Sequence, residues 1–370
     1  METGVWRGEP ATAYARWAAL EERAARELAS ALERASAEIR SGGGELAARL
    51  AAIELPAAVV AGAPSSPVRL PTRPRTAAQR DLENRARLAV DLGGSGPHRK
   101  IAAIIAGRLA ELARGGETVQ LIEYDPAAFG GDGAVVVAIG DLDAARNIGV
   151  VVPGMGTTAA SIGSVTLDAA RLQVAARRAD PTTATATVAW IGYDAPSGPA
   201  AAGQVLTGVH ARRGAAELRA DLADLRRMRP DRPRVVVFGH SYGSTTVATA
   251  AADGALAGTV DALVLLGSPG AGPVRSAAET GVPVYVARDR DDPVPAAGGF
   301  DGAGRALRRL WGVELGLGAD PSAPSFGATA LPAGGPAGFG VAAHSGYFDE
   351  ESSSLGAFAE VLVGARSAAR

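Results

Sequence analysis

The chain has 370 residues, of which 47% are hydrophobic and 21% charged, and its formal net charge is −2. Such a chain can bury a large core, and its near-neutral charge argues against nucleic acid or an anionic membrane surface as the main partner. Because it has no cysteine, disulfides, cysteine zinc sites and a thiol nucleophile are excluded.

The N-terminal part predicts one long amphipathic helix over residues 9–40. Its apolar positions recur at spacings of three and four, which is the period of a helix face. Ser41-Gly42-Gly43-Gly44 ends this helix, and prolines and serines in residues 61–76 indicate a linker. We therefore expect an N-terminal helical region over residues 1–75 and a second domain over residues 76–370. The apolar positions are Trp17, Leu20, Ala24, Leu28, Ala31, Ala35 and Ile39.

The start of this helix, with Trp6-Arg7-Gly8, resembles the second helix of the Trp-x-Gly helical-hairpin proteins associated with type VII secretion, over residues 4–40. The resemblance implies a helical partner for the apolar stripe. It also makes export by a type VII-like route the alternative to a cytoplasmic location. We expect a cytoplasmic protein without a membrane span, since no conventional signal peptide and no apolar stretch of about 18 residues is present.

The pattern after the linker predicts an α/β fold with a mainly parallel sheet covered by helices on both faces. Two helices, over residues 76–92 and 98–114, precede an antiparallel hairpin of residues 119–124 and 135–139. Five further strands alternate with helical connections, a last strand is expected over 326–331, and a helix over 355–363 closes the domain. The five strands are 148–152, 187–191, 234–238, 262–266 and 283–287.

A strand, a sharp turn and a helix meet at Ser241. Val235 to Phe238 reads as a strand, Gly239-His240-Ser241-Tyr242-Gly243 follows, and the next residues have helical character. The two glycines allow a turn tight enough to strain the serine and raise its hydroxyl above the sheet edge. The pattern therefore predicts a nucleophile elbow.

A serine nucleophile needs a histidine as base and a carboxylate that orients it. With this elbow the chain order is serine, acid, histidine, and His344 is the only histidine after Ser241. For the acid we favour Asp292, because Pro293 biases it to an extended conformation. Asp289 and Asp291 remain alternatives, and neither composition nor spacing excludes them.

Two backbone amides are expected to hold the oxyanion. One belongs to Tyr242, which follows the nucleophile, and the other to the loop after the third strand. In that loop, Pro153-Gly154-Met155-Gly156, we favour the amide of Met155 over that of Gly156. We further expect the side chains of Tyr242, Met155 and Asp194 to wall an open cleft, with residues 300–321 as a candidate lid.

Two other interpretations use the same residues. Gly154-x-Gly156-x-x-Ala159 satisfies a dinucleotide-binding fingerprint, but the expected acidic residue should stand about 20 residues on, and Asp194 comes much later. The aspartates at 289, 291 and 292 could form a calcium loop, but Arg290 lies among them and no glycine supplies the turn. We therefore expect no cofactor and no metal.

Several segments together resemble an actinobacterial α/β-hydrolase family of unknown function, over about residues 80–365. The resemblance implies an α/β-hydrolase fold and a Ser-Asp-His triad, and it implies no particular substrate. This chain departs from the family mainly in its arginine-rich Arg288-Asp289-Arg290-Asp291. The segments are Asn84-Arg85-Ala86-Arg87-Leu88, Val152-Pro153-Gly154-Met155-Gly156-Thr157, Trp190-Ile191-Gly192-Tyr193-Asp194-Ala195-Pro196, Gly239-His240-Ser241-Tyr242-Gly243-Ser244, Asp292-Pro293 and His344-Ser345-Gly346-Tyr347-Phe348.

The sequence thus predicts a serine hydrolase that cleaves a small-molecule carboxylic ester or thioester. An acyltransferase with the same triad is an alternative, since the two differ only in how well water is excluded. A binding or secretion-linked module that keeps the fold without catalysis is an alternative of another class.

Overall fold

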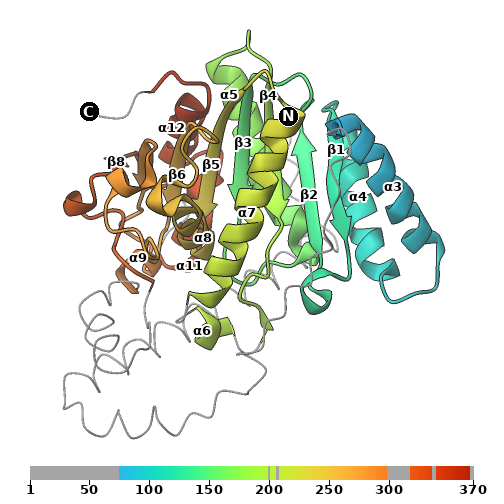
Figure 1. Cartoon of the computed structure of the whole chain (residues 1–370), viewed down its shortest axis with the longest axis horizontal. Helices are drawn as coiled ribbons and strands as arrows, with labels where there is room; N and C mark the ends of the chain where they lie inside the picture. The colour runs from blue at the N-terminus through green and yellow to red at the C-terminus, as the bar shows by residue number, and fades with distance from the viewer. Residues whose placement is uncertain (1–74, 199–200, 206–207, 298–316, 336–338, 367–370) are drawn as a thin grey trace, which may run out of the picture.

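A computed structural model describes residues 75–198, 201–205, 208–297, 317–335 and 339–366. Figure 1 shows a central sheet with helices on both of its faces, and α3 (Ala77–Gly93) and α4 (Arg99–Arg114) at the end where the sheet begins. The predicted helix of residues 9–40 lies outside the described residues. So does most of the candidate lid of residues 300–321.

Eight strands form one sheet in the order β1-β2-β4-β3-β5-β6-β7-β8. β2 pairs antiparallel with both β1 and β4, and every later pairing is parallel. The predicted strands are all present, although the last is only two residues long. Their bounds are β1 Val119–Asp125, β2 Ala134–Ile139, β3 Asn147–Val152, β4 Thr185–Ile191, β5 Arg234–His240, β6 Ala262–Leu266, β7 Val284–Ala287 and β8 Thr329–Ala330.

Both faces of the sheet are buried because alternate side chains of each strand enter separate hydrophobic clusters. In β5, Val236 and Phe238 belong to one cluster, while Val235 and Val237 belong to the other. This is why the strands read as nearly continuous apolar runs in the sequence. The first cluster is covered by α4, α5 (Ile162–Ala179) and α12 (Ser353–Leu362), and the second by α7 (Val209–Met228) and α8 (Tyr242–Ala251).

The two helices before the sheet agree with the prediction within one or two residues. Thr76 caps α3 through a capping box, in which its hydroxyl accepts from the Gln79 amide at 3.2 Å and the Gln79 side chain accepts from the Thr76 amide at 3.1 Å. The short helices α6 (Ala201–Gln204), α9 (Val294–Ala297) and α11 (Val341–Ser345) lie in loops.

Parallel pairing from β3 through β8 brings several loops to one edge of the sheet. The loops after β3, β5, β7 and β8 all leave from carboxyl ends, and this is where ligands of open α/β sheets bind. These loops carry Met155, Ser241, Asp292 and His344. The topology therefore collects the predicted site residues although almost 190 residues separate the first from the last.

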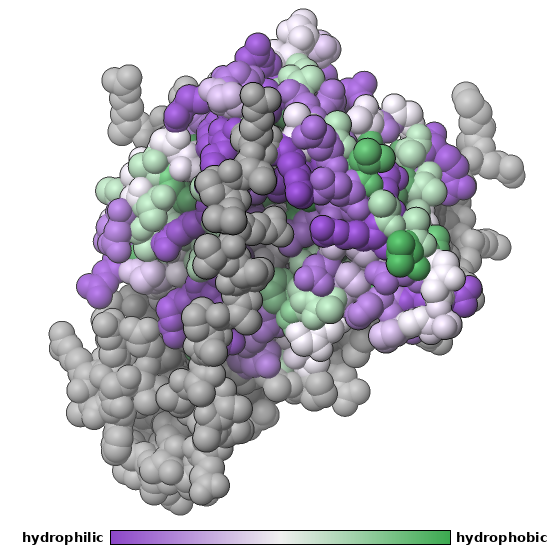
Figure 2. All heavy atoms as spheres, turned by 45° about the vertical axis from the view of Figure 1, so that its right-hand side comes forward, coloured by the Kyte–Doolittle hydropathy of each residue, from purple (hydrophilic) through white to green (hydrophobic). Residues whose placement is uncertain are grey.

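Hydrophilic side chains cover much of the face in Figure 2, with hydrophobic side chains in small patches between them. Of the described residues, seven large hydrophobic side chains are exposed, and three of them are on α3: Leu82, Val90 and Leu92. Within the same ranges, no helix has both the length and the apolar character that crossing a membrane requires.

Candidate active site

Ser241 lies at the turn between β5 and α8 with φ 54° and ψ −130°, a conformation that L-residues rarely adopt. Its two glycine neighbours are needed for this turn. A Cβ on Gly239 would lie 2.7 Å from the Ser244 Cα, and a Cβ on Gly243 would lie 2.4 Å from the carbonyl oxygens of Val152 and Pro153. The structure thus has a central strand, a strained serine at its end and a helix directly after it.

Asp292 and His344 come together although 52 residues separate them. The His344 Nδ1 lies 2.9 Å from the Asp292 Oδ2, and both side chains are buried. The other carboxylate oxygen accepts from the Val294 amide at 2.9 Å. Burial alone would raise the pKa of Asp292, but hydrogen bonds from His344, Tyr347 and the Val294 amide outweigh it and hold that pKa below its usual range. Asp292 is thus an ionised partner for one histidine nitrogen.

The structure does not bring the two alternative acids to His344. Asp289 is buried, but its Oδ1 accepts from the Asp291 amide at 2.9 Å, which makes a local turn. Asp291 is exposed, and its carbonyl oxygen accepts from the Gly340 amide at 2.9 Å. Both residues make hydrogen bonds within or from the loop after β7. The bond at Asp291 connects this loop to the loop that carries His344.

Sequence reasoning missed a second side-chain donor to Asp292, in addition to His344. The Tyr347 hydroxyl donates to the Asp292 Oδ2 at 2.8 Å and accepts from the Asp289 amide at 3.0 Å. Tyr347 follows His344 by three residues and stands in the His344-Ser345-Gly346-Tyr347-Phe348 segment quoted above, but neither fact indicates a contact with Asp292. The packing around the pair is tight, because a Cβ on Gly267 would lie 2.8 Å from the Asp292 Oδ2 and 2.9 Å from the His344 Nδ1.

We expect Tyr347→Phe to lower kcat by about tenfold with little change in KM, since it removes one hydrogen bond to a charged carboxylate and leaves the apolar ring in place. Steady-state kinetics on an activated ester would measure this. Tyr285→Phe is the matched control, because the Tyr285 hydroxyl bonds to the Arg366 carbonyl oxygen at 3.1 Å and contacts no site residue. Equal kcat values for the two variants would contradict a positioning role for Tyr347.

The loop after β3 packs directly on Ser241. A Cβ on Gly154 would lie 2.6 Å from the Ser241 Cβ and 3.1 Å from its Oγ, so only glycine fits there. The Gly156 amide donates to the Pro196 carbonyl oxygen at 2.7 Å and is engaged. The Met155 amide has no partner in the described part of the chain. The Tyr242 amide is in the first turn of α8, where helix N–H groups lack helical acceptors. The Met155 amide thus stays a candidate oxyanion donor together with that of Tyr242, while the Gly156 amide is engaged elsewhere.

The prediction that the Tyr242 side chain walls a cleft is wrong. That side chain is 1% exposed, and its hydroxyl accepts from the Ala211 amide at 3.0 Å, so it points into the core beside α7. A side chain at the first position of a helix leans back toward the preceding strand, which the sequence pattern did not take into account. Asp194 is partly exposed, and its carboxylate lies 3.3 Å from the His210 Nδ1.

His240, the residue before Ser241, also contacts the loop that carries His344. Its Nε2 lies 2.7 Å from the His344 carbonyl oxygen, so this nitrogen carries the proton and donates, and the two rings are 4.8 Å apart. Burial, aided by the proximity of His344, lowers the pKa of His240 from 6.5 to about 4. A neutral His240 thus ties the elbow to the loop of His344.

This shift predicts a contribution of His240 to stability that depends on pH. Because its pKa is lower in the folded chain, only the unfolded chain takes up the proton as pH falls from 6.5 toward 4. The free energy of unfolding should therefore fall in this window, by up to about 3 kcal/mol from this residue. Urea unfolding at several pH values should show a shallower decline for His240→Gln, which keeps a donor. Parallel pH profiles for both proteins would contradict the assignment.

The fold and the residues at its sheet edge define a class. A mainly parallel eight-stranded sheet of this order, with a strained serine after β5, an acid after β7 and a histidine after β8, is the α/β-hydrolase fold. Residues 125–300 match the model of a family described as Alpha/beta hydrolase.

Relatives of this chain include mycobacterial proteins. An uncharacterized protein of Mycobacterium tuberculosis is 37% identical over 263 residues, which cover 66% of this chain and 39% of the relative. An uncharacterized protein of Mycobacterium bovis is 34% identical over 142 residues, covering 36% of this chain and 51% of the relative. The chain thus spans well under two thirds of the length of these relatives.

Solved structures with some similarity include two esterases. The esterase of Pyrobaculum calidifontis gives a TM-score of 0.39 at 14% identity, covering 76% of this chain and 98% of that one. A thermostable esterase from Pseudomonas putida gives a TM-score of 0.35 at 14% identity, covering 75% of this chain and 94% of that one.

Proposed function

We propose that the chain is a serine hydrolase that cleaves a carboxylic ester, or a thioester, through an acyl-enzyme. In this mechanism Ser241 is the nucleophile, His344 the general base and acid, and Asp292 the residue that orients His344 and stabilises its charged form. The amides of Met155 and Tyr242 would donate to the oxyanion. The substrate would be a small molecule.

The observation that carries the proposal is the buried pair of Asp292 and His344. A carboxylate on Nδ1 fixes the tautomer in which Nδ1 carries the proton, and Nε2 is then free to accept one. The pKa of the Asp292 carboxyl lies below its usual range, which supports an ionised Asp292 at neutral pH. The tight contact between Gly154 and Ser241 supports an oxyanion site on the loop after β3.

The reaction would proceed in two stages, formation of the acyl-enzyme and its hydrolysis. Ser241 Oγ would attack the carbonyl carbon while its proton passes to the His344 Nε2, and the tetrahedral intermediate would expel the alcohol or thiol, which takes that proton. Water would then add to the acyl-enzyme with His344 as base, and the acid product would leave with Ser241 restored. The neutral state of His240 supports this scheme, since a second imidazolium beside His344 would oppose protonation of His344.

Hydrolysis of p-nitrophenyl acetate tests the proposal. We expect a burst of p-nitrophenolate, close to one equivalent per chain, followed by slower turnover as the acyl-enzyme hydrolyses. Added alcohol that raises the rate of p-nitrophenolate release and yields an acetate ester would indicate acyl transfer. Turnover that persists unchanged in Ser241→Ala would refute the mechanism.

We also propose the domain division that follows from this assignment. Residues 76–370 would form the hydrolase unit, since α3 starts at the Thr76 cap and every residue of the proposed mechanism comes after it. Residues 1–75 would form a separate N-terminal region.

A further inference from the structure

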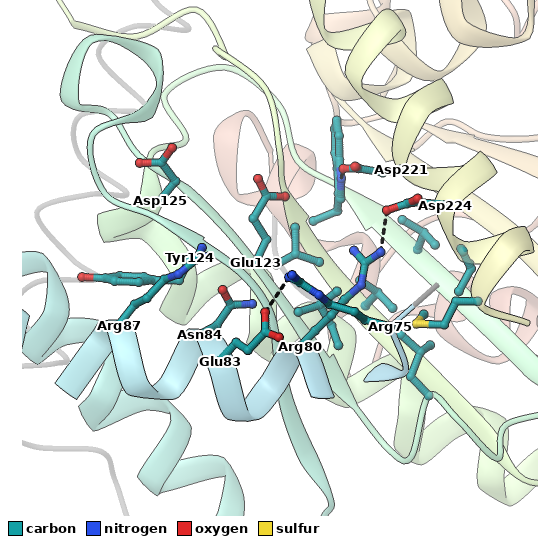
Figure 3. A pocket seen from close by; sticks show the side chains of 18 of the residues that line it. Arg75, Arg80, Glu83, Asn84, Arg87, Glu123, Tyr124, Asp125, Asp221 and Asp224 are labelled. Carbon is teal, nitrogen blue, oxygen red and sulfur yellow. Dashed lines mark hydrogen bonds and ion pairs between the residues drawn. The ribbon is translucent and has the colours of Figure 1, made fainter. Parts of the chain in front are cut away.

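A cavity of about 1410 Å³ lies between α3 and α7, away from the residues of the proposed mechanism. Its floor is apolar and is formed by side chains of the sheet, among them Ile122, Val136 and Val188. Figure 3 shows Glu83 and Arg80 on the α3 side and Asp221 and Asp224 on the α7 side. The cavity is therefore a groove with an apolar floor and charged walls.

The described chain begins at the rim of this groove. Arg75 lines it, and Thr76 then caps α3, which forms one wall. Residues 1–74 are therefore covalently attached to the chain at this rim. α3 also leaves apolar surface uncovered beside the groove, since Val90 lines the groove and is 74% exposed. The N-terminal region is thus attached beside a groove whose α3 wall has an exposed apolar side chain, Val90.

Carboxylates outnumber arginines in the groove by six to four. Three of them are bonded to neutral donors: Asp91 to the Tyr124 hydroxyl, Asp125 to the Ala127 amide and Asp221 to the Trp190 indole. Burial, together with the charges of Asp224 and Glu217, raises the pKa of Asp221 to about 6. The Arg80 Nε is buried without an acceptor in the described ranges. Both signs of charge therefore have bonding capacity left.

The sequence of residues 9–40 fits such a surface. As a helix it has the apolar stripe that includes Trp17 and Leu28, which needs an apolar partner. Arg16, Arg23 and Arg34 are spaced by seven and eleven residues, close to whole numbers of turns, so they share one flank of the stripe. Glu9, Glu27 and Glu38 fall between these arginines and the stripe, so this flank carries both signs of charge.

We propose that residues 9–40 bind the groove between α3 and α7 of the same chain as an amphipathic helix. The stripe packs on the sheet floor, and the charged flank with Arg16, Arg23 and Arg34 faces Asp221 of α7, because Asp224 is already paired with Arg80 and Arg227. This is the helix-in-groove mode, read by anchors at helical spacing. The connecting residues 41–74 keep the helix at a high effective concentration near the groove, which favours the same chain over a second copy.

Cysteine cross-linking tests this docking in the full chain, which has no cysteine of its own. We would pair Leu28→Cys with Val90→Cys and treat the protein with a short bismaleimide. Arg26→Cys with Val90→Cys is the matched control, because residue 26 is two positions from Leu28 and so on the opposite side of a helix. Leu28→Cys with Val174→Cys is a second control, since Val174 is exposed on α5, which covers the other face.

Intact mass and denaturing gels then separate the outcomes. The proposal predicts a cross-link within one chain for Leu28 with Val90, at a yield at least about fivefold above both controls. Adding Arg23→Glu should lower this yield several-fold. Cross-linked dimers in place of the intramolecular product would overturn the proposal in favour of a second copy. Equal yields for all three pairs would overturn docking altogether, and neither result bears on the proposed hydrolysis.

Discussion

Replacing Ser241 by alanine is expected to lower kcat on an activated ester by about 10⁴- to 10⁶-fold, because no other group supplies the attacking oxygen. The folded state should be almost unaffected, since the Ser241 hydroxyl makes no hydrogen bond to the residues that the structure describes. We expect a change in unfolding free energy within about 0.5 kcal/mol. Steady-state kinetics and urea unfolding of the same preparation would measure both quantities.

Ser353→Ala is the matched control for this variant. Ser353 is exposed on α12, and its hydroxyl donates to the Gly334 carbonyl oxygen at 2.9 Å. It should keep kcat within a factor of about two. If Ser241→Ala retained more than a few per cent of the activity of a pure preparation, another nucleophile would have to be sought.

Asp292→Asn is expected to give the second large loss, about 10²- to 10⁴-fold in kcat. The amide cannot stabilise the imidazolium, and it favours the tautomer in which His344 Nε2 carries the proton and cannot act as base. The substituted side chain has the same size, so folding should persist. A kcat measured across pH, with circular dichroism as the folding check, would establish the loss.

The neighbouring aspartates supply controls of identical chemistry. Asp291→Asn changes an exposed side chain and should cost less than about tenfold in kcat. Asp289→Asn keeps an oxygen that can accept from the Asp291 amide and should behave similarly. A loss at either position that exceeds the loss at Asp292 would reassign the acid of the proposed mechanism.

Much of this fold follows from local sequence patterns. Buried parallel strands are continuous apolar runs, so β3, β5 and β6 could be located to within a few residues. The glycines beside Ser241 fix the elbow because each Cβ would collide with backbone atoms. Such signals depend on near neighbours in the chain, and they were therefore readable without the structure.

The contacts that complete the site depend on packing between distant segments. Nothing in the sequence shows that the Tyr347 hydroxyl reaches Asp292, or that the His240 ring donates to the His344 carbonyl oxygen across 104 residues. The three aspartates of one loop could not be separated by composition, because the direction of each side chain is set by turns such as the one that Asp289 makes with the Asp291 amide. The Tyr242 prediction was wrong for the same reason, since α7 supplies the amide that holds its hydroxyl.

A fluorophosphonate probe examines the proposed nucleophile directly, because it forms a stable bond only with an activated hydroxyl. The wild-type chain would be incubated with the probe. Its intact mass would be measured, and the labelled residue would be located by peptide mass spectrometry. We expect one adduct per chain, on the peptide that contains Ser241, and none on Ser241→Ala or on heat-unfolded protein. A folded wild-type chain that stays unlabelled by several probes of different size, or that is labelled equally in Ser241→Ala, would contradict the assignment of Ser241 as the nucleophile.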